Sequence, residues 1–439
     1  MRSGSRDDRA PHAAAGDRFR APYTARPTLG AGDRQIRQWE QGYSPPRAAF
    51  VCDRHVDDYA IEALIHKHAS STSCDFCDRA GSDPFAADAS LILDRISGAL
   101  RRHWTDPEDV LLYDSESDSG FAGSVYDFED VLEAEGARPF ADDAFQEYVV
   151  DAFRESTWTG DDPAVLPESE ARRFNWELLT ETVKHEARFL FVLLEEPEDE
   201  SEPGYPLRLG GAMLRELGDL INRFGLVIDL PEGETLHRIR PHRPDEHPTS
   251  AGELGTPPAR LTSQSRMCPA GIPMFYGATD QATARAETTT PATEAATAAT
   301  FQTTPARIVD LDRIPAEPSL FDLSEQATAD RPALGFLAGF RYDISRPIDR
   351  DDRIHIDYVP TQVVCEYLRH LFRDSDDRPV DGLAWESAQR RGGRNIVLFV
   401  RNQLCLDADA ADPSGWDEGK LALRIASHQP LDVTAGRSG

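Results

Sequence analysis

The N-terminal half of the chain shows apolar residues that recur at helical spacing, separated by acidic stretches. The pattern predicts helices over 85–104, 142–155 and 168–185. The run 188–194, which is apolar after Arg188, predicts a strand. The stretch 105–140 is acidic and has no apolar period, so it is expected to be irregular. This half is therefore predicted to be mostly helical.

The C-terminal half is richer in short strand patterns. Apolar and β-branched runs between turn residues predict strands at 226–230, 272–276, 298–304, 307–311 and 395–400. Amphipathic patterns predict two helices, over 209–224 and 361–372. The Thr/Ala-rich stretch 282–304 has the composition of a disordered linker, but it lies between predicted strands. We therefore expect a short helix and then a β-branched strand within it.

These patterns predict an α+β protein in four parts. Residues 1–46 lack an apolar period and are expected to be a disordered tail. A mostly helical N-terminal domain, with a small zinc-binding segment, is predicted over 47–225. A mixed β-sheet domain with short helices follows over 226–428, and 429–439 is expected to be a loose tail. The charged, Pro-rich segment Glu195–Pro206 is a break or long loop within this plan.

Charge and composition narrow the classes of function. The 439 residues carry a formal net charge of −30, and an acidic surface repels phosphate backbones, so nucleic-acid binding is not expected. The sequence has neither an apolar run of membrane-spanning length nor an N-terminal apolar signal region, so we expect a cytoplasmic protein. Nearly all basic residues are arginines, which is typical of a GC-rich genome and also suits a protein that binds pyrophosphate.

Two short-spaced pairs of metal-binding residue types lie near the N-terminus. Cys52 and His55 form a C-x2-H pair, and Cys74 and Cys77 form a C-x2-C pair. A two-residue spacer lets both members of a pair reach one ion, and four ligands fill a tetrahedral zinc site. We therefore predict a structural zinc ion at Cys52, His55, Cys74 and Cys77.

Alternatives to this zinc site remain open from the sequence alone. His66 or His68 can replace His55 as the fourth ligand, and the cysteines can instead be reduced thiols packed in a core. Six cysteines in a chain of this length do not indicate a disulfide scaffold. Cys365 and Cys405 lie in apolar stretches and are interpreted as core residues.

Several segments of the C-terminal half carry residue types suited to a nucleotide ligand. Arg238 and Arg240 are two apart on a predicted strand, so both point to one face, where they suit two phosphates or a ribose phosphate. Arg266 precedes a Pro-Ala-Gly-Ile-Pro turn and an apolar run that ends at Tyr276, whose ring can stack on a flat heterocycle. Taken alone, each feature also fits a surface arginine pair and a core tyrosine.

Two further residues have side-chain oxygens that could take part in catalysis. Glu287 lies eleven residues beyond Tyr276, late in a predicted short helix, and Ser387 ends a predicted strand before a Gly-Gly turn. Taken alone, Glu287 fits an exposed helix carboxylate and Ser387 fits a turn cap. The chain has no Gly-x-Gly-x-x-Gly fingerprint, so a hydride-transfer enzyme of the Rossmann type is not expected.

In their order and in the residues that they contain, these segments resemble the RES domain family, which is named for its Arg, Glu and Ser. The resemblance runs from Leu236 to Leu406 and includes the helix that begins near Tyr358 and the Asp-Gly block before Ser387. The upstream half is similar to an N-terminal domain, classed with the HEPN group, that is often fused to RES. The resemblance implies an ADP-ribosyltransferase-like sheet domain and a toxin that consumes NAD⁺.

The resemblance also implies roles for individual residues. The residues that would be catalytic are Arg238, Tyr276, Glu287 and Ser387, and those that would bind NAD⁺ are Arg240 and Arg266. Glu287 would stabilise a ribosyl cation as the nicotinamide bond breaks, and Ser387 would place the ribose. Water, phosphate or a protein side chain as the acceptor remain open. Cys268 and His237 depart from the family, which more often has a small polar residue and an aromatic residue there.

The resemblance implies a partner, and two other functions remain open. Short RES toxins pair with a small helix-turn-helix antitoxin, and the N-terminal half of this longer chain could regulate it instead. A HEPN ribonuclease needs Arg-x4–6-His on a helix, and in the first 200 residues that spacing occurs only from Arg6 to His12, within the predicted tail. A non-catalytic zinc-binding protein is disfavoured because all four family residues are present.

Overall fold

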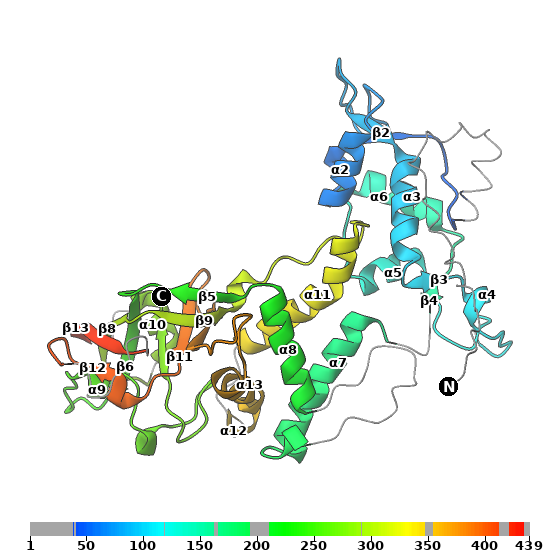
Figure 1. The fold of residues 1–439 in the computed structure, drawn as a ribbon. Coiled ribbons are helices and arrows are strands. Elements are labelled where there is room, and N and C mark those ends of the chain that lie inside the picture. The colour runs from blue at the N-terminus through cyan, green and yellow to red at the C-terminus, as the bar shows by residue number, and fades with distance from the viewer. Residues whose placement is uncertain are drawn as a thin grey trace, which may run out of the picture.

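The computed structural model describes residues 38, 41–117, 119–161, 166–193, 210–290, 292–346, 354–411 and 421–433. The chain is mixed α and β: a helical N-terminal part, a middle layer of helices, and a large mixed sheet follow one another across the molecule (Figure 1). Most of the predicted disordered tail, including Arg6 and His12, lies outside the described residues. No described helix is long and apolar enough to cross a membrane.

The N-terminal part consists of short helices and two small antiparallel sheets. One sheet pairs β1 (Phe50–Cys52) with β2 (Ala86–Asp88), and the other pairs β3 (Trp104–Thr105) with β4 (Thr159–Gly160). The helices are η1 (Asp53–His55), α2 (Tyr59–Lys67), α3 (Ala89–Leu100), α4 (Pro107–Val110), α5 (Phe128–Ala134) and α6 (Asp143–Phe153).

Aspartates start most of these helices. The side chains of the residues before α2 to α6 each accept a backbone N–H of the first turn: Asp58, Asp88, Asp106, Asp127 and Asp142. Such a cap satisfies an amide that has no partner within the helix. The acidic stretch 105–140 therefore contains two short helices, α4 and α5, and the prediction that it is irregular was wrong for these segments.

The N-terminal core extends further along the chain than the pattern predicts. Tyr43 belongs to the segment expected to be disordered, but it is buried and its hydroxyl donates to Asp94 at 2.6 Å. The prediction of disorder is thus wrong for residues 41–46. The buried ring of Tyr43 anchors this segment in the core, although the segment has no apolar period. Leu320 and Phe321, from far downstream, also pack in this core.

The middle layer holds the longest helices. Its elements are α7 (Glu168–Glu181), the π-helical turn η2 (Thr182–Glu186), η3 (Phe191–Leu193), α8 (Gly211–Arg223), α11 (Glu325–Ser345), α12 (Ile354–Asp357) and α13 (Val359–His370). These helices, apart from α12, which has no buried residue, share one hydrophobic core with strands β9 to β11. The predicted strand over 188–194 is wrong, because its described residues form a turn and η3, with Phe189 and Leu193 exposed rather than paired.

Helix α11 connects the N-terminal part to the middle layer (Figure 1). No pattern in the sequence predicted it, because small residues and Pro332 interrupt its apolar face. Ser324 caps its first turn by accepting the N–H of Ala327, and Phe336 and Phe340 anchor its later turns in the middle core. Tertiary packing therefore outweighs a weak local preference for helix.

The large sheet has nine strands in the order β12-β13-β8-β6-β7-β11-β10-β9-β5. Only the pairs β9–β10 and β12–β13 are parallel. The strands are β5 (Val227–Leu230), β6 (Thr235–His242), β7 (Phe275–Ala278), β8 (Ala295–Thr303), β9 (Ala306–Asp310), β10 (Gly382–Glu386), β11 (Arg394–Leu398), β12 (Cys405–Leu406) and β13 (Leu423–Leu431). The short helices beside them are α9 (Ala251–Leu254), η4 (Ala259–Leu261), α10 (Gln281–Thr288), η5 (Leu311–Arg313) and η6 (Asn402–Leu404).

Most of the strands predicted in this half are present. The Thr/Ala-rich stretch is ordered as predicted, since it forms α10 and then β8. Strand β7 begins at Phe275, later than predicted, because the Pro-rich turn precedes it. The prediction of a loose tail is wrong for residues 429–431, because they belong to β13 and pair with residues 296–298 of β8.

Candidate functional site

Four neighbouring strands, β6, β7, β11 and β10, carry or directly precede three of the predicted catalytic residues. Arg238 lies on β6 and Tyr276 on β7, and Tyr276 is opposite Val397 on β11. Strand β10 pairs with β11 and ends at Glu386, so Ser387 directly follows it. Tyr276 and Val397, 121 positions apart in the sequence, are thus held on adjacent strands by backbone hydrogen bonds.

Glu287 faces this region because of its position in α10. Asp280 caps the helix by accepting the N–H of Thr283, and both Thr283 and Ala284 are buried. Glu287 lies three and four residues further on, so it shares their face. The alternative of an exposed helix carboxylate is therefore wrong.

The carboxylate of Glu287 is held by two side chains. Ser387 Oγ donates to Glu287 Oε1 at 2.6 Å, and Asn395 Nδ2 donates to the same oxygen at 2.7 Å. Ser387 and Asn395 are almost completely buried, with 4% and 1% of their surfaces exposed. Glu287 and Ser387, which the resemblance assigns to one site, are thus in direct contact, and the sequence reasoning missed Asn395. Its only signal was a polar residue within an otherwise apolar strand.

The turn between β10 and β11 positions Ser387. Its N–H donates to Gly393 O at 2.8 Å, and its Oγ also accepts the N–H groups of Gln389 and Arg390, each at 3.2 Å. A Cβ on Gly393 would lie 2.3 Å from Thr283 Oγ1. Glycine at this position therefore lets α10 approach the turn closely enough for Ser387 to reach Glu287.

Tyr276 lies next to this hydrogen-bonded group. Its ring makes an edge contact with Trp385, with ring centroids 5.6 Å apart. Burial raises the pKa of Tyr276 above its usual value, the charge of Glu287 raises it further, and Arg266 opposes the shift. The tyrosine is therefore a neutral hydroxyl at physiological pH, suited to stacking and hydrogen bonding rather than to use as a base.

The three predicted arginines donate to backbone carbonyls. Arg238 donates to Leu254 O at 3.1 Å and to Tyr276 O, Arg240 donates to Glu253 O, and Arg266 donates to Ile344 O at 2.7 Å. In the described part of the chain, none of them forms an ion pair with a carboxylate. Burial lowers the pKa of Arg238, which indicates a desolvated cation. These contacts fix the guanidinium groups without neutralising them.

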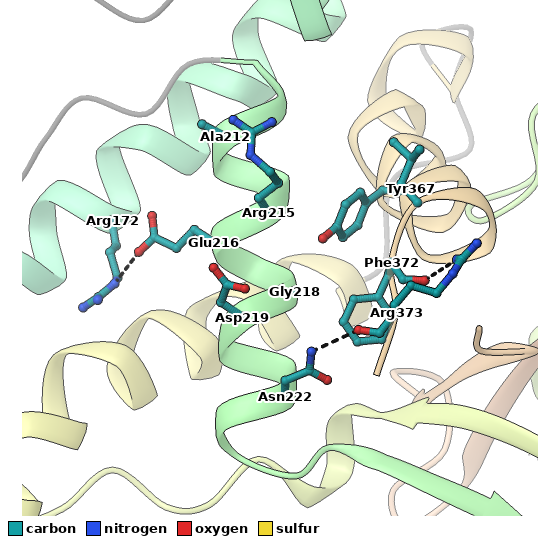
Figure 2. A pocket seen from close by; sticks show the side chains of 11 residues that line it. Arg172, Ala212, Arg215, Glu216, Gly218, Asp219, Asn222, Tyr367, Phe372 and Arg373 are labelled. Carbon is teal, nitrogen blue, oxygen red and sulfur yellow. Dashed lines mark hydrogen bonds and ion pairs between the residues drawn. The ribbon is translucent and has the colours of Figure 1, made fainter. Parts of the chain in front are cut away.

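A surface pocket of about 610 Å³ lies elsewhere, between α8 and the end of α13 (Figure 2). Arg172 extends toward it from α7 and pairs with Glu216 at 2.8 Å. Asn222 Nδ2 donates to Arg373 O at 3.0 Å across the lower end of the pocket. None of the predicted site residues lines it, and its buried arginine already has acidic partners, so we do not assign the dinucleotide to it.

The predicted metal ligands also converge. One ligand atom from each of Cys52, His55, Cys74 and Cys77 lies within 4.8 Å of the others, so the group could hold a metal ion. His66 does not belong to it, because its ring pairs with Asp53 at 2.9 Å. This group lies in the N-terminal part near β2, well away from the large sheet (Figure 1).

Two family models agree with the resemblance drawn from the sequence. Residues 67–197 match the family described as HEPN/RES N-terminal domain 1, and residues 235–418 match the RES domain. No curated protein matches the chain. Among solved structures, a match is found to a chain of the M. tuberculosis MbcT-MbcA toxin-antitoxin complex, with 17% identity, 49% of this chain and 91% of that chain covered, and a TM-score of 0.25.

Proposed function

The chain carries a RES domain behind a HEPN/RES N-terminal domain, and from this premise we propose that it is a toxin that cleaves the nicotinamide–ribose bond of NAD⁺. The observation that carries the proposal is the carboxylate of Glu287, which Ser387 and Asn395 fix beside Tyr276. A fixed carboxylate is what a reaction through a ribosyl cation needs. The large mixed sheet would then be of the ADP-ribosyltransferase type.

In the proposed reaction, the bond between the nicotinamide nitrogen and the ribose carbon breaks first. Nicotinamide leaves as a neutral molecule with the bonding electron pair, and the ribose becomes an oxocarbenium-like cation. Glu287 stabilises that cation, and Tyr276 stacks on the nicotinamide or its ribose. Water, phosphate or a protein nucleophile then donates an electron pair to the same carbon and gives up a proton.

The arginines would bind the pyrophosphate of NAD⁺. Arg238, Arg240 and Arg266 are held by carbonyl groups, and in the described part of the chain none of them forms an ion pair with a carboxylate. A phosphate would form charge-assisted, forked hydrogen bonds with such groups. A cytoplasmic location follows from this substrate, and a small helix-turn-helix antitoxin is the partner that the RES family implies.

The test is release of nicotinamide from NAD⁺ by the purified chain. We expect release by the wild type, and the products with and without phosphate or cell extract to distinguish hydrolysis, phosphorolysis and ADP-ribosyl transfer. No release under any of these conditions would contradict the proposal. RNA cleavage without nicotinamide release would favour the HEPN ribonuclease, and neither activity would favour a non-catalytic zinc-binding protein.

Replacing Ser387 with Ala should slow nicotinamide release. The change removes the hydroxyl that donates to Glu287 but leaves Asn395 as a second donor, so the carboxylate is held less firmly. Loss of a hydrogen bond to a charged group typically lowers a rate about 10- to 100-fold, and we expect this decrease in kcat. Ser387→Ala with unchanged kcat and a raised KM would instead mean that the hydroxyl acts on bound ribose. Ser427→Ala, on exposed β13, is the matched control with no expected effect.

A further inference from the structure

The group of three cysteines and one histidine is built from two separate pieces of chain. Cys52 ends β1 and His55 ends η1, whereas Cys74 and Cys77 lie in the loop before β2. Backbone contacts join these pieces: Asp75 N donates to Phe50 O at 2.8 Å, and Phe50 N donates to Asp75 Oδ2 at 2.6 Å. The loop is therefore folded against β1 with its sulfur atoms directed at one point.

The spacing of the sulfur atoms fits a tetrahedral ion. Cys52 Sγ and Cys77 Sγ lie 3.9 Å apart, without a disulfide between them. Zinc–sulfur bonds of about 2.3 Å in tetrahedral geometry would place two ligand sulfurs roughly 3.8 Å apart. The N–H of Phe76 donates to Cys74 Sγ at 3.5 Å, a contact that stabilises negative charge on sulfur. The alternative of three thiols packed only by apolar contact does not account for this arrangement.

His55 provides an independent sign of a missing partner. Its Nδ1 pairs with Asp142 Oδ2, which leaves Nε2 free to act as a ligand. The histidine is only 4% exposed, so water does not reach Nε2 easily. Nevertheless, Nε2 has no hydrogen-bond partner in the described part of the chain. An unsatisfied buried nitrogen is costly, whereas a metal-binding histidine typically has its other ring nitrogen held by a carboxylate.

We propose that Cys52, His55, Cys74 and Cys77 form a closed zinc site, with Asp142 orienting the histidine, and that the ion fixes the cysteine loop to α6. Thiolate and imidazole ligands favour zinc over magnesium or calcium, and four protein ligands leave no position for substrate. Asp142 also caps α6 by accepting the N–H of Phe145 at 3.2 Å, so one carboxylate connects the ion to the start of that helix.

The ion would also control an aromatic contact. Phe76 lies between Cys74 and Cys77 in the sequence, and its ring packs edge-on against Phe145 and Tyr148 of α6, with centroids 5.1 and 5.2 Å apart. The loop has few other apolar residues to hold it in the core. Loss of zinc would therefore free Phe76 and loosen the N-terminal core, while the large sheet, which lies well away from β2 (Figure 1), would keep its fold.

The first experiment is metal analysis of the purified full-length chain. We expect one zinc per chain, and after exchange with Co²⁺, the visible absorption bands of tetrahedral thiolate ligation. The double variant Cys74→Ser/Cys77→Ser should lose the ion. His66→Ala, in the neighbouring exposed group with Asp53 and Glu62, is the matched control and should retain it. A wild-type chain without zinc and without cobalt–thiolate bands would overturn the proposal, as would iron in its place.

The second experiment tests Asp142 without breaking a ligand. Asn is as good a helix cap as Asp, so Asp142→Asn should keep α6. Phe145 and His55 bind different oxygens of Asp142, and the amide NH2 that replaces one of these oxygens cannot accept a hydrogen bond. We expect zinc affinity, measured by competition with a chromophoric chelator, to fall about 10- to 100-fold with the circular dichroism unchanged. Unchanged affinity would remove Asp142 from the site. This result does not depend on NAD⁺ cleavage, so the two proposals can fail separately.

Discussion

Replacing Glu287 with Gln is expected to reduce nicotinamide release from NAD⁺ by roughly 10²- to 10³-fold, which is typical for the loss of one electrostatic contact to a transition state. Gln keeps an oxygen that accepts from Ser387 and Asn395, so the side chain should keep its place. What it loses is the negative charge that would face the ribosyl cation. The loss should therefore appear in kcat, measured by following nicotinamide at saturating NAD⁺.

The control for this change is Glu294→Gln, because Glu294 is exposed in the turn between α10 and β8 and lies close to the site in sequence. It removes the same charge at an exposed position seven residues further along the chain, and the rate should stay within about twofold. The thermal unfolding temperature should be unchanged in both variants. A Glu287→Gln rate close to that of the wild type would mean that another group stabilises the cation, and the proposed mechanism would be wrong.

Replacing Phe321 with Ala should destabilise the N-terminal part by about 3–5 kcal/mol, the usual cost of truncating a buried phenylalanine. Phe321 is only 1% exposed and packs in the N-terminal core although it precedes α11 in the sequence. Arg95 Nη1 donates to its carbonyl oxygen at 2.9 Å, so the backbone would not easily collapse into the space left behind. Urea unfolding followed by tryptophan fluorescence would measure the loss.

Leu112→Ala provides the control for that measurement, since Leu112 is in the same part of the chain but 80% exposed, and its change should stay within about 0.5 kcal/mol. If Phe321→Ala shifts the unfolding free energy by no more than the control does, the packing of this segment into the N-terminal core is refuted. The contact matters for organisation, because Tyr59 also donates to Asp322 at 3.0 Å and Arg331 of α11 donates to Glu135 O at 2.9 Å.

These contacts show that residues of each half pack in the core of the other half, which the predicted division into four parts does not include. Helices α7 and α8 precede residue 226, but Trp176, Leu217 and other apolar residues on them pack in the same core as β9 to β11. In the other direction, Leu320 and Phe321 complete the N-terminal core. A boundary at residue 225 remains a prediction of sequence pattern, because a change in composition along the chain does not reveal which faces pack together.

The sequence alone determined the features that depend on neighbouring residues. Periodic apolar positions predicted α3, α6, α8 and α13, and turn residues bounded β5 and β9. The C-x2-H and C-x2-C pairs predicted the four residues that converge on a group able to hold a metal ion, since two ligands on one short segment can reach one ion without help from the rest of the fold. The order of the Arg, Tyr, Glu and Ser segments was enough to identify the RES domain.

Only the tertiary structure decided which of these residues meet. Glu287 and Ser387 are 100 positions apart, and Asn395 was missed because a lone polar residue in an apolar strand gives no sign of its partner. His55 lies in the cysteine group with its ring held by Asp142, 87 positions away, whereas His66 pairs with Asp53. Such contacts are set by strand order and helix packing, which join distant segments through burial and backbone hydrogen bonds, and local periodicity does not encode that pairing.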